Sequence, residues 1–133
     1  MAELFILALL GHLVGDYLLQ SKEMALHKSD KGWYGMFLCT VHVAIYTIAV
    51  CVFLGTYDPV VVLAIFIPHW LIDHWSLASD WLAFIRGRTF EAAYASTHKY
   101  REFDIAFTSI VYTAVDNTMH LVCLWLVIQF LMV

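Results

Sequence analysis

The stretch GHLVGDYLLQ, from Gly11 to Gln20, places two ionisable side chains, His12 and Asp16, inside an apolar run that begins at Leu4. Residues four apart on an α-helix lie on the same face. A helix that presents a histidine and an aspartate together on one face needs a polar centre to receive them. The stretch therefore bears both on the fold of the chain and on the location of a functional site.

The rest of the chain is much more apolar than a soluble domain. Of its 133 residues, 62% are hydrophobic and 14% are charged, whereas soluble domains average about 25% charged residues. A bilayer needs about 20 apolar residues per spanning helix, and four segments approach that length: residues 2–20, 35–54, 60–85 and 105–133. We therefore predict an all-α fold, a single integral membrane four-helix bundle over residues 1–133.

The basic residues predict the orientation of this bundle. All seven lie in two loops, one after the first predicted helix and one between the third and fourth, and the turn 55–59 has none. They are Lys22, Lys28, Lys31, Arg86, Arg88, Lys99 and Arg101. Because cytoplasmic loops carry an excess of lysine and arginine, we expect both basic loops in the cytoplasm and both termini outside.

The His–Asp spacing of the first helix recurs on two others. HWLID contains His69 and Asp73, and DNTMH contains the reversed pair Asp116 and His120. Since the fourth helix runs opposite to the first and third, each histidine lies on the outer side and each aspartate about 6 Å closer to the cytoplasm. His42 on the second helix has a depth comparable with the aspartates. We expect these side chains to share one polar centre.

A metal site is the interpretation that best explains this cluster. A charged group in mid-bilayer costs about 2.5 to 3.5 kcal/mol, and imidazole and carboxylate ligands around divalent cations compensate that cost. The predicted ligands are His12, Asp16, His42, His69, Asp73, Asp116 and His120. We expect them to hold two divalent ions, with zinc favoured and iron or manganese compatible with the same ligand types. Such ions activate water for hydrolysis, with one of the three aspartates as general base.

The blocks HLVGDYLLQ, HVAIY, HWLID and DNTMH are also those in which the chain resembles a known family. It is similar to small bacterial and phage membrane proteins classed as domain of unknown function 3307, over most of its length. That family resembles, in its HxxxD helices, inner-membrane proteins described as metal-dependent hydrolases. The resemblance implies a hydrolase-like site in a protein of the bacterial inner membrane, encoded by a bacterium or a phage.

Further side chains are candidates for the surroundings of the site. The candidates for orienting ligands or contacting a substrate are Tyr17, Gln20, Tyr46, Arg86, Arg88, Lys99 and Arg101. The four basic ones lie in the second loop, which also suits a short helix at the headgroup level, and membrane topology alone is the alternative reason for their charge. His74 points about 100° away from the His69 face, so we leave it outside the site.

The small pair Gly11 and Gly15 predicts close helix packing, either within the bundle or between the two copies of a homodimer. We expect membrane lipids, and no nucleic acid, as partners.

Three functions fit these patterns. The first is a metal-dependent hydrolase acting on a lipid or another membrane-associated ester. The second is a metal-ion or proton transporter, because intramembrane His and Asp residues also mark ion pathways, although the outer half of the bundle offers almost no polar atoms to continue such a path. The third is a non-catalytic membrane protein in which the His/Asp cluster only stabilises the fold.

Overall fold

The computed structural model describes residues 1–133 and contains helices and no strand, which confirms the predicted all-α class. The α-helices are α1 (Ala2–Leu13), α2 (Lys22–His27), α3 (Trp33–Leu54), α4 (Pro59–His74), α5 (Leu77–Arg86), α6 (Phe90–Ala95) and α7 (Arg101–Val127). The π-helical segments Val14–Leu18 and Ile128–Met132 extend α1 and α7. The predicted first, second and fourth helices correspond to α1, α3 and α7.

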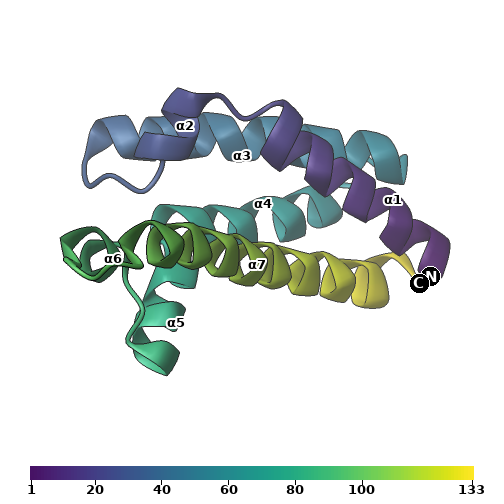
Figure 1. The fold of residues 1–133 in the computed structure, drawn as a ribbon. Helices are drawn as coiled ribbons and strands as arrows, with labels where there is room; N and C mark the ends of the chain where they lie inside the picture. Colours follow the sequence, from purple (N-terminus) through teal and green to yellow (C-terminus); the bar gives the residue numbers. More distant parts are fainter.

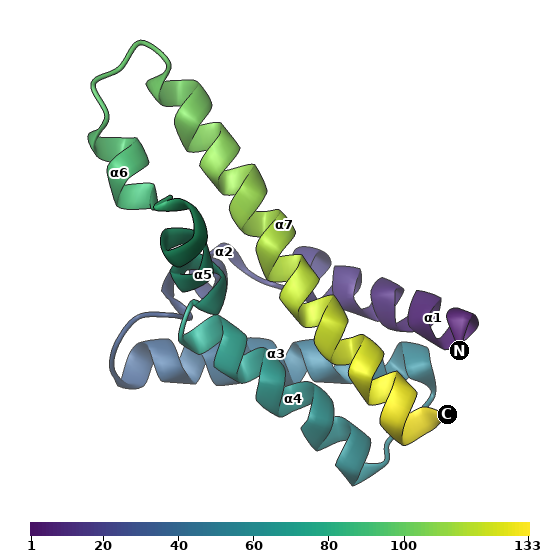
Figure 2. The same cartoon turned by 90° about the horizontal axis from the view of Figure 1, so that it is seen from below.

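The longer helices form two layers, with α1 beside α3 in one and α4 beside α7 in the other (Figure 1). Helix α1 packs on α3, α3 on α4 and α4 on α7, and α1 also contacts α7. Both termini lie at one end of the molecule, and α5 and α6 lie at the other (Figure 2). The apolar core fills the half nearer the termini, with Val50, Ile65, Leu124 and Ile128 almost fully buried.

Two helices are long and apolar enough to cross a membrane, Trp33–Leu54 and the combined Arg101–Met132. A third candidate span arises if α4 and α5 are counted together, although they are bent by 56°. The first helix with its π-helical segment, Ala2–Leu18, lies at the lower limit of about 17 residues for a spanning helix. The outer surfaces of these helices are apolar, with Ile48, Ile110 and Phe130 all more than 60% exposed.

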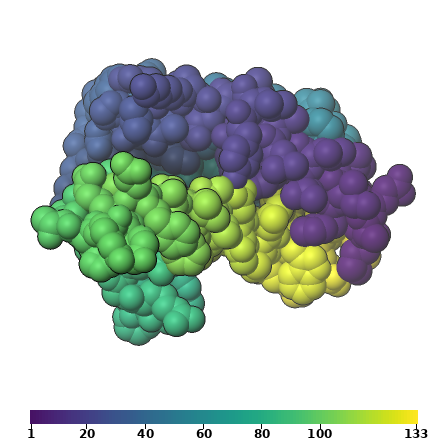
Figure 3. All heavy atoms as spheres, in the orientation of Figure 1, coloured from purple at the N-terminus to yellow at the C-terminus, as the bar shows by residue number.

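The prediction of one continuous helix over residues 60–85 is corrected by the structure. The helix breaks at Trp75 and Ser76, where Ser76 adopts the left-handed conformation with φ 50°. The axis turns by 56° there, and α5 protrudes from the underside of the molecule (Figure 3). The residues on both sides of Ser76 are apolar, so the hydropathy pattern is continuous there. The helical backbone, in contrast, is interrupted.

The predicted loops contain two short helices, each with a side-chain cap. Ser21 caps α2 by accepting a hydrogen bond from the Met24 amide at 3.2 Å. Thr89 caps α6 by accepting one from the Ala92 amide at 3.1 Å, and α6 is the short helix expected in the second basic loop. Helix α7 begins at Arg101, four residues before the predicted start at 105.

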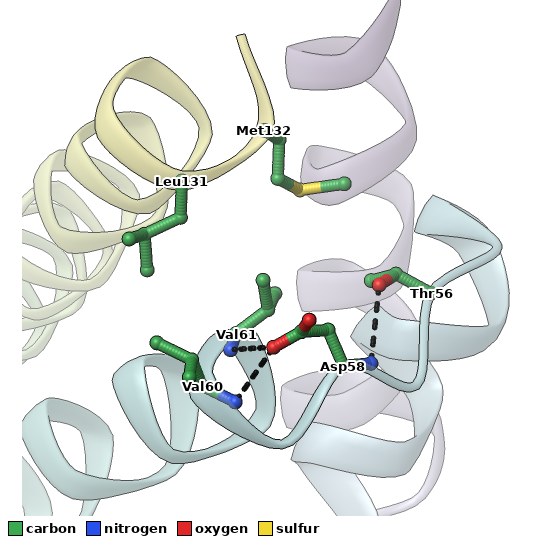
Figure 4. A pocket seen from close by; sticks show the side chains of 6 residues that line it. All are labelled: Thr56, Asp58, Val60, Val61, Leu131 and Met132. Atoms are coloured by element: carbon green, nitrogen blue, oxygen red, sulfur yellow. Dashed lines mark hydrogen bonds between the residues drawn. The ribbon is translucent and has the colours of Figure 1, made fainter.

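At the end nearer the termini, the turn between α3 and α4 is also tightly capped. The Asp58 carboxylate accepts hydrogen bonds from the amides of Val60 and Val61 at 2.8 and 3.4 Å (Figure 4). Leu131 and Met132 line the other side of the same surface pocket. The only carboxylate in this turn is thus held by the α4 N-terminus and does not reach the interior.

The glycines of the first helix allow α1 to approach α3 closely. A Cβ on Gly11 would lie 2.7 Å from Val50 Cα, and one on Gly15 would lie 2.7 Å from Tyr46 Cδ2 and 3.0 Å from Tyr46 Cα. The prediction of close packing through these glycines is confirmed, and the contact is made within one chain. This approach brings the π-helical segment that carries Asp16 against the middle of α3.

Candidate metal centre

Four helices bring the predicted ligands to one place in the middle of the molecule. The four histidines of the cluster are between 0 and 2% exposed. They are His12 on α1, His42 on α3, His69 on α4 and His120 on α7. Asp16 lies on the π-helical segment that follows α1, a distortion that is frequent at functional sites. The prediction of a shared polar centre is therefore confirmed in its arrangement.

Three donor atoms of this cluster form a triangle with the dimensions of a zinc site. Asp16 Oδ1 lies 3.3 Å from His42 Nε2 and 3.6 Å from His69 Nε2, and the two nitrogens lie 3.3 Å apart. Ligand atoms of a tetrahedral zinc ion, each about 2.0 to 2.1 Å from the metal, lie about 3.4 Å from one another. Asp16 Oδ1 is buried and has no hydrogen-bond partner. The triangle therefore fits three ligands of one ion, and Asp73 Oδ2 lies beside it, 3.2 Å from each of the two nitrogens.

A second group shares His69 with this triangle and adds Asp73 and His120. His120 Nδ1 lies 3.0 Å from the Asp116 carbonyl oxygen, so this nitrogen carries the proton and donates it. The other nitrogen, Nε2, then presents a lone pair to Asp73 Oδ1 at 3.7 Å, and neither atom has a hydrogen-bond partner. Two acceptors facing each other in a buried place are expected where a cation lies between them.

Two predicted ligands, His12 and Asp116, lie outside both groups. His12 Nε2 donates to Asn117 Oδ1 at 2.6 Å, and His12 Nδ1 accepts from the Tyr46 hydroxyl at 3.2 Å. Both ring nitrogens of His12 are therefore occupied. The nearest cluster contact of Asp116 is 3.7 Å from its Oδ2 to His120 Nδ1. The structure thus makes His12 a hydrogen-bonded neighbour of the site and leaves the Asp116 carboxylate free of the ligand triangle.

Lys28 is a site residue that the sequence analysis missed. Its Nζ lies 2.8 Å from Asp73 Oδ2, and its side chain is only 13% exposed. Burial lowers the pKa of Lys28, but the carboxylate of Asp73, followed by those of Asp16 and Asp116, outweighs burial and raises it. Lys28 is therefore charged. With all three aspartates ionised and the histidines neutral, the aspartates and Lys28 together carry a net charge of −2.

Two further residues hold the Lys28 segment in place. His74 Nδ1 donates to the Lys28 carbonyl oxygen at 3.2 Å, so His74 lies outside the ligand cluster, as predicted, but has a role beside it. Gln20, with its amide oxygen turned inward, accepts from Lys28 Nζ at 3.1 Å and faces His42 Nε2 at 3.2 Å. The structure thus places Gln20 next to the ligands.

The two candidate tyrosines have different positions. Tyr46 is 1% exposed, and its ring centroid lies 3.7 Å from that of His69. Tyr17 is 53% exposed and accepts a hydrogen bond from the Asn117 amide. The Asn117 amide also donates to the Thr113 carbonyl oxygen at 2.7 Å, which fixes the orientation in which its oxygen faces His12. Tyr46 thus packs against the ligands. Tyr17 is connected to the site only through the hydrogen bonds from Asn117 to Tyr17 and from His12 to Asn117.

The centre reaches the surface at two of its carboxylates. Asp16 and Asp116 have side chains 11 and 18% exposed, whereas the ligand histidines are buried. Toward the termini, the cavity beside His69 and His120 measures about 10 Å³, which is room for no more than a water molecule. Beyond it lie the apolar side chains of the core. Any molecule that reaches the centre must therefore come from the side of Asp16, Asp116 and Lys28.

The basic candidates of the second loop lie elsewhere. No hydrogen bond or ion pair connects Arg86, Arg88, Lys99 or Arg101 to the cluster. Arg88 lies over the Phe107 ring, Lys99 over the Tyr100 ring, and Arg101 Nε donates to the Tyr94 carbonyl oxygen. The structure does not bring these four side chains to the predicted ligands.

The fold and the site define an all-helical protein with two or three candidate membrane spans and a buried His/Asp cluster that fits a divalent cation. The chain belongs to the family described as protein of unknown function (DUF3307), whose model matches residues 4–133. Searches of curated proteins and of solved structures gave no significant match.

Proposed function

We propose that the chain spans a membrane with four helices, both basic loops on the cytoplasmic side and both termini outside. The spans are α1 with its π-helical segment, α3, α4 with α5, and α7. Two observations support this placement: the apolar outer surface of these helices, and the location of all seven basic residues in the two loops away from the termini. In this placement the open side of the cluster faces the cytoplasmic half.

The cluster is then a metal-dependent hydrolase centre that acts on a lipid or another membrane-associated ester. The observation that carries this proposal is the triangle of Asp16 Oδ1, His42 Nε2 and His69 Nε2, with edges of 3.3 to 3.6 Å. Catalytic zinc sites have three protein ligands and leave a fourth position for water or substrate, whereas structural sites have four. A bound ion would supply Lewis-acid activation of water and of the ester.

The surrounding residues have separate tasks in this reaction. Asp116 is close to the ligands but outside the triangle and 18% exposed, so it serves as the general base that accepts a proton from water. Lys28 carries a positive charge beside Asp73 and stabilises negative charge that develops on the substrate. Tyr46 and Asn117 hold His12 in one orientation, and the apolar core excludes water from the side of the termini.

The number of ions follows from charge and from lone pairs. One divalent cation balances the net charge of −2 on Asp16, Asp73, Asp116 and Lys28. The two ligand groups share His69, whose Nε2 has a single lone pair. We therefore expect one tightly bound ion in the triangle, zinc before iron or manganese. A second ion, at Asp73 and His120, binds more weakly because Lys28 already neutralises Asp73.

The two other candidate functions are a purely structural role of the cluster and transport of metal ions or protons. The structure supports the structural role better than transport. The 10 Å³ cavity beside His69 and His120 leaves no room for a substrate on that side, which is what a structural centre requires. A transport path would have to cross the apolar core between the cluster and the termini, where Val50, Ile65 and Leu124 are buried. The hydrolase and the structural centre are therefore the pair to separate by experiment.

The test combines metal analysis with an ester substrate. Purified wild-type protein, Asp16→Asn and Asp116→Asn would be repleted with zinc and measured by inductively coupled plasma mass spectrometry. Release of fatty acid from dioleoyl phosphatidylglycerol vesicles would be followed in the same samples. We expect about one zinc in the wild type, loss of zinc in Asp16→Asn, and retained zinc with hydrolysis reduced about 10²- to 10⁴-fold in Asp116→Asn.

Controls make the outcomes distinct. His98→Gln removes an exposed loop histidine whose ring accepts a hydrogen bond only from the backbone amide of Tyr100, and it should leave metal content and hydrolysis unchanged. Zinc binding without hydrolysis of the vesicles or of a panel of short-chain esters would overturn the hydrolase and leave the structural centre. A folded wild type that takes up no metal after repletion would overturn both.

A further inference from the structure

A second polar cavity, lined by none of the cluster residues, lies between α5, the start of α6 and the first half of α7. Its volume is about 260 Å³. The polar side chains that line it are Ser79, Asp80, Arg88, Thr89, Thr108 and Tyr112. None of them takes part in the metal centre, so the cavity needs a separate explanation.

Arg88 provides an unpaired cation in this cavity. Its Nη1 is buried and has no hydrogen-bond partner, and no carboxylate lies within ion-pair distance of its guanidinium. The guanidinium lies over the Phe107 ring, 4.4 Å from the ring centroid, a cation–π contact that helps to hold it in place. A buried guanidinium nitrogen without a partner is costly, and an oxyanion would satisfy it with paired hydrogen bonds.

Thr108 provides a second free donor in the same cavity. It is 1% exposed, and its hydroxyl has no hydrogen-bond partner. Hydroxyls on neighbouring turns of α7 behave differently: Ser109, Thr113 and Thr118 each donate to the carbonyl oxygen four residues earlier, at 2.7 to 3.0 Å. Among the serine and threonine hydroxyls of α7, only that of Thr108 has no partner, and Thr108 lines the cavity with Arg88.

Asp80 limits the kind of ligand that the cavity can bind. It is an exposed carboxylate on the cavity wall and forms no ion pair with Arg88 or with any other cation. A free anion would be repelled by this carboxylate, whereas a ligand that carries an ammonium group next to its phosphate would bind both charged residues. The lining thus fits a zwitterion, with phosphate toward Arg88 and Thr108 and ammonium toward Asp80.

The other side of α5 indicates where such a ligand comes from. A larger groove of about 690 Å³ lies there between α5 and α7, and ten of its eleven lining residues are hydrophobic, among them Leu77, Trp81, Val111 and Val115. Helices α5 and α7 line both the polar cavity and this groove. One lipid would fit both places, with its headgroup in the polar cavity and an acyl chain in the apolar groove.

We propose that the cavity of Arg88, Thr108 and Asp80 binds the phosphoethanolamine headgroup of a phospholipid. The site is independent of the activity proposed for the His/Asp cluster, because none of its residues contacts the ligands there. Free phosphoethanolamine has the same chemistry, and the test separates the two sources.

Native mass spectrometry of the detergent-purified full chain tests the proposal. The protein would be titrated with dioleoyl phosphatidylethanolamine, dioleoylglycerol and free phosphoethanolamine. We expect the phospholipid to bind at least tenfold more tightly than dioleoylglycerol, and at least tenfold more weakly to Arg88→Gln. The matched control Arg86→Gln, which changes an exposed arginine outside the cavity, should bind like the wild type. Free phosphoethanolamine binding as tightly as the lipid would identify a soluble ligand and overturn the lipid source.

Thr108→Val distinguishes loss of a ligand contact from loss of the fold. Because the Thr108 hydroxyl has no partner, removing it should leave the lipid-free protein at least as heat-stable as the wild type. Binding of the phospholipid should still weaken about threefold or more. Equal binding by wild type, Arg88→Gln and Thr108→Val would overturn the site. Equal binding of dioleoyl phosphatidylglycerol, which has no ammonium group, would overturn the assignment of Asp80.

Discussion

Replacing Gly15 with alanine tests the connection between helix packing and the metal centre. The new Cβ would lie 2.7 Å from Tyr46 Cδ2 and 3.0 Å from Tyr46 Cα, whereas ordinary contact begins at 3.4 Å. The separation must therefore increase by about 0.7 Å at the ring and 0.4 Å at the backbone. The ring cannot simply turn aside, because Tyr46 is 1% exposed and packs 3.7 Å from the His69 ring.

The expected cost follows from this clash. Overpacking a well-packed interior typically costs about 1 to 3 kcal/mol, so Gly15→Ala should lower the free energy of unfolding by that amount. Since Tyr46 positions both His12 and His69, the displacement should also disturb the ligands. Loss of an outer-shell contact commonly costs 10- to 100-fold in metal affinity, and we expect zinc affinity to fall at least tenfold.

Gly11→Ala is the matched control for this prediction. Its Cβ would lie 2.7 Å from Val50 Cα, on the same interface but one turn away from Tyr46. Both variants should lose stability in unfolding by sodium dodecyl sulfate, followed by tryptophan fluorescence, and only Gly15→Ala should lose zinc affinity in competition with a chromophoric chelator. A Gly15→Ala protein that matches the wild type in both measurements would refute the reasoning.

Three smaller predictions follow from individual contacts. Tyr46→Phe removes the hydroxyl that donates to His12 and should cost about 1 kcal/mol in the same unfolding assay; an unchanged protein would contradict that bond. Ser76→Gly relieves a left-handed backbone at φ 50° and should stabilise the protein by about 1 kcal/mol, so a loss of stability would argue against the break at Ser76. The hydrogen bond to Asp30 raises the pKa of His27, so this contact stabilises the fold at low pH and its contribution is lost as the pH rises through the raised pKa. NMR titration should show the pKa falling in Asp30→Asn, and an unchanged pKa would exclude the contact.

The sequence predicted the helices well where hydropathy alone decides them. The run at residues 35–54 became α3 with almost the same bounds, because a long apolar segment between a basic loop and Gly55 has few other conformations. The break at Ser76 could not be predicted in this way. Its left-handed backbone lies between two apolar stretches, and beyond it α5 packs on α7, a contact between separate segments that hydropathy does not indicate.

The candidate site was predicted in outline but not in its details. The spacing of the pairs and the depth of His42 identified the residues that meet in the centre. The same spacing could not show that His12 has both nitrogens occupied, because Asn117 and Tyr46 come from other helices. Lys28 was missed because it lies 45 residues from Asp73 in a loop, where a lysine indicates topology and no periodic pattern marks a buried contact.

The bend after α4 has a consequence for the surrounding lipid. Helix α4 has 16 residues and is about 24 Å long, whereas the hydrocarbon core of a bilayer is about 30 Å thick. Under the proposed membrane placement, α4 therefore ends before it has crossed the core, and α5, bent by 56° from it, has to complete the span. A span shortened by such a bend creates a hydrophobic mismatch, which thins the adjacent bilayer or selects thinner membranes. The protein should therefore be sensitive to acyl chain length, and the thinned bilayer would bring headgroups nearer to the side on which Asp16 and Asp116 are exposed.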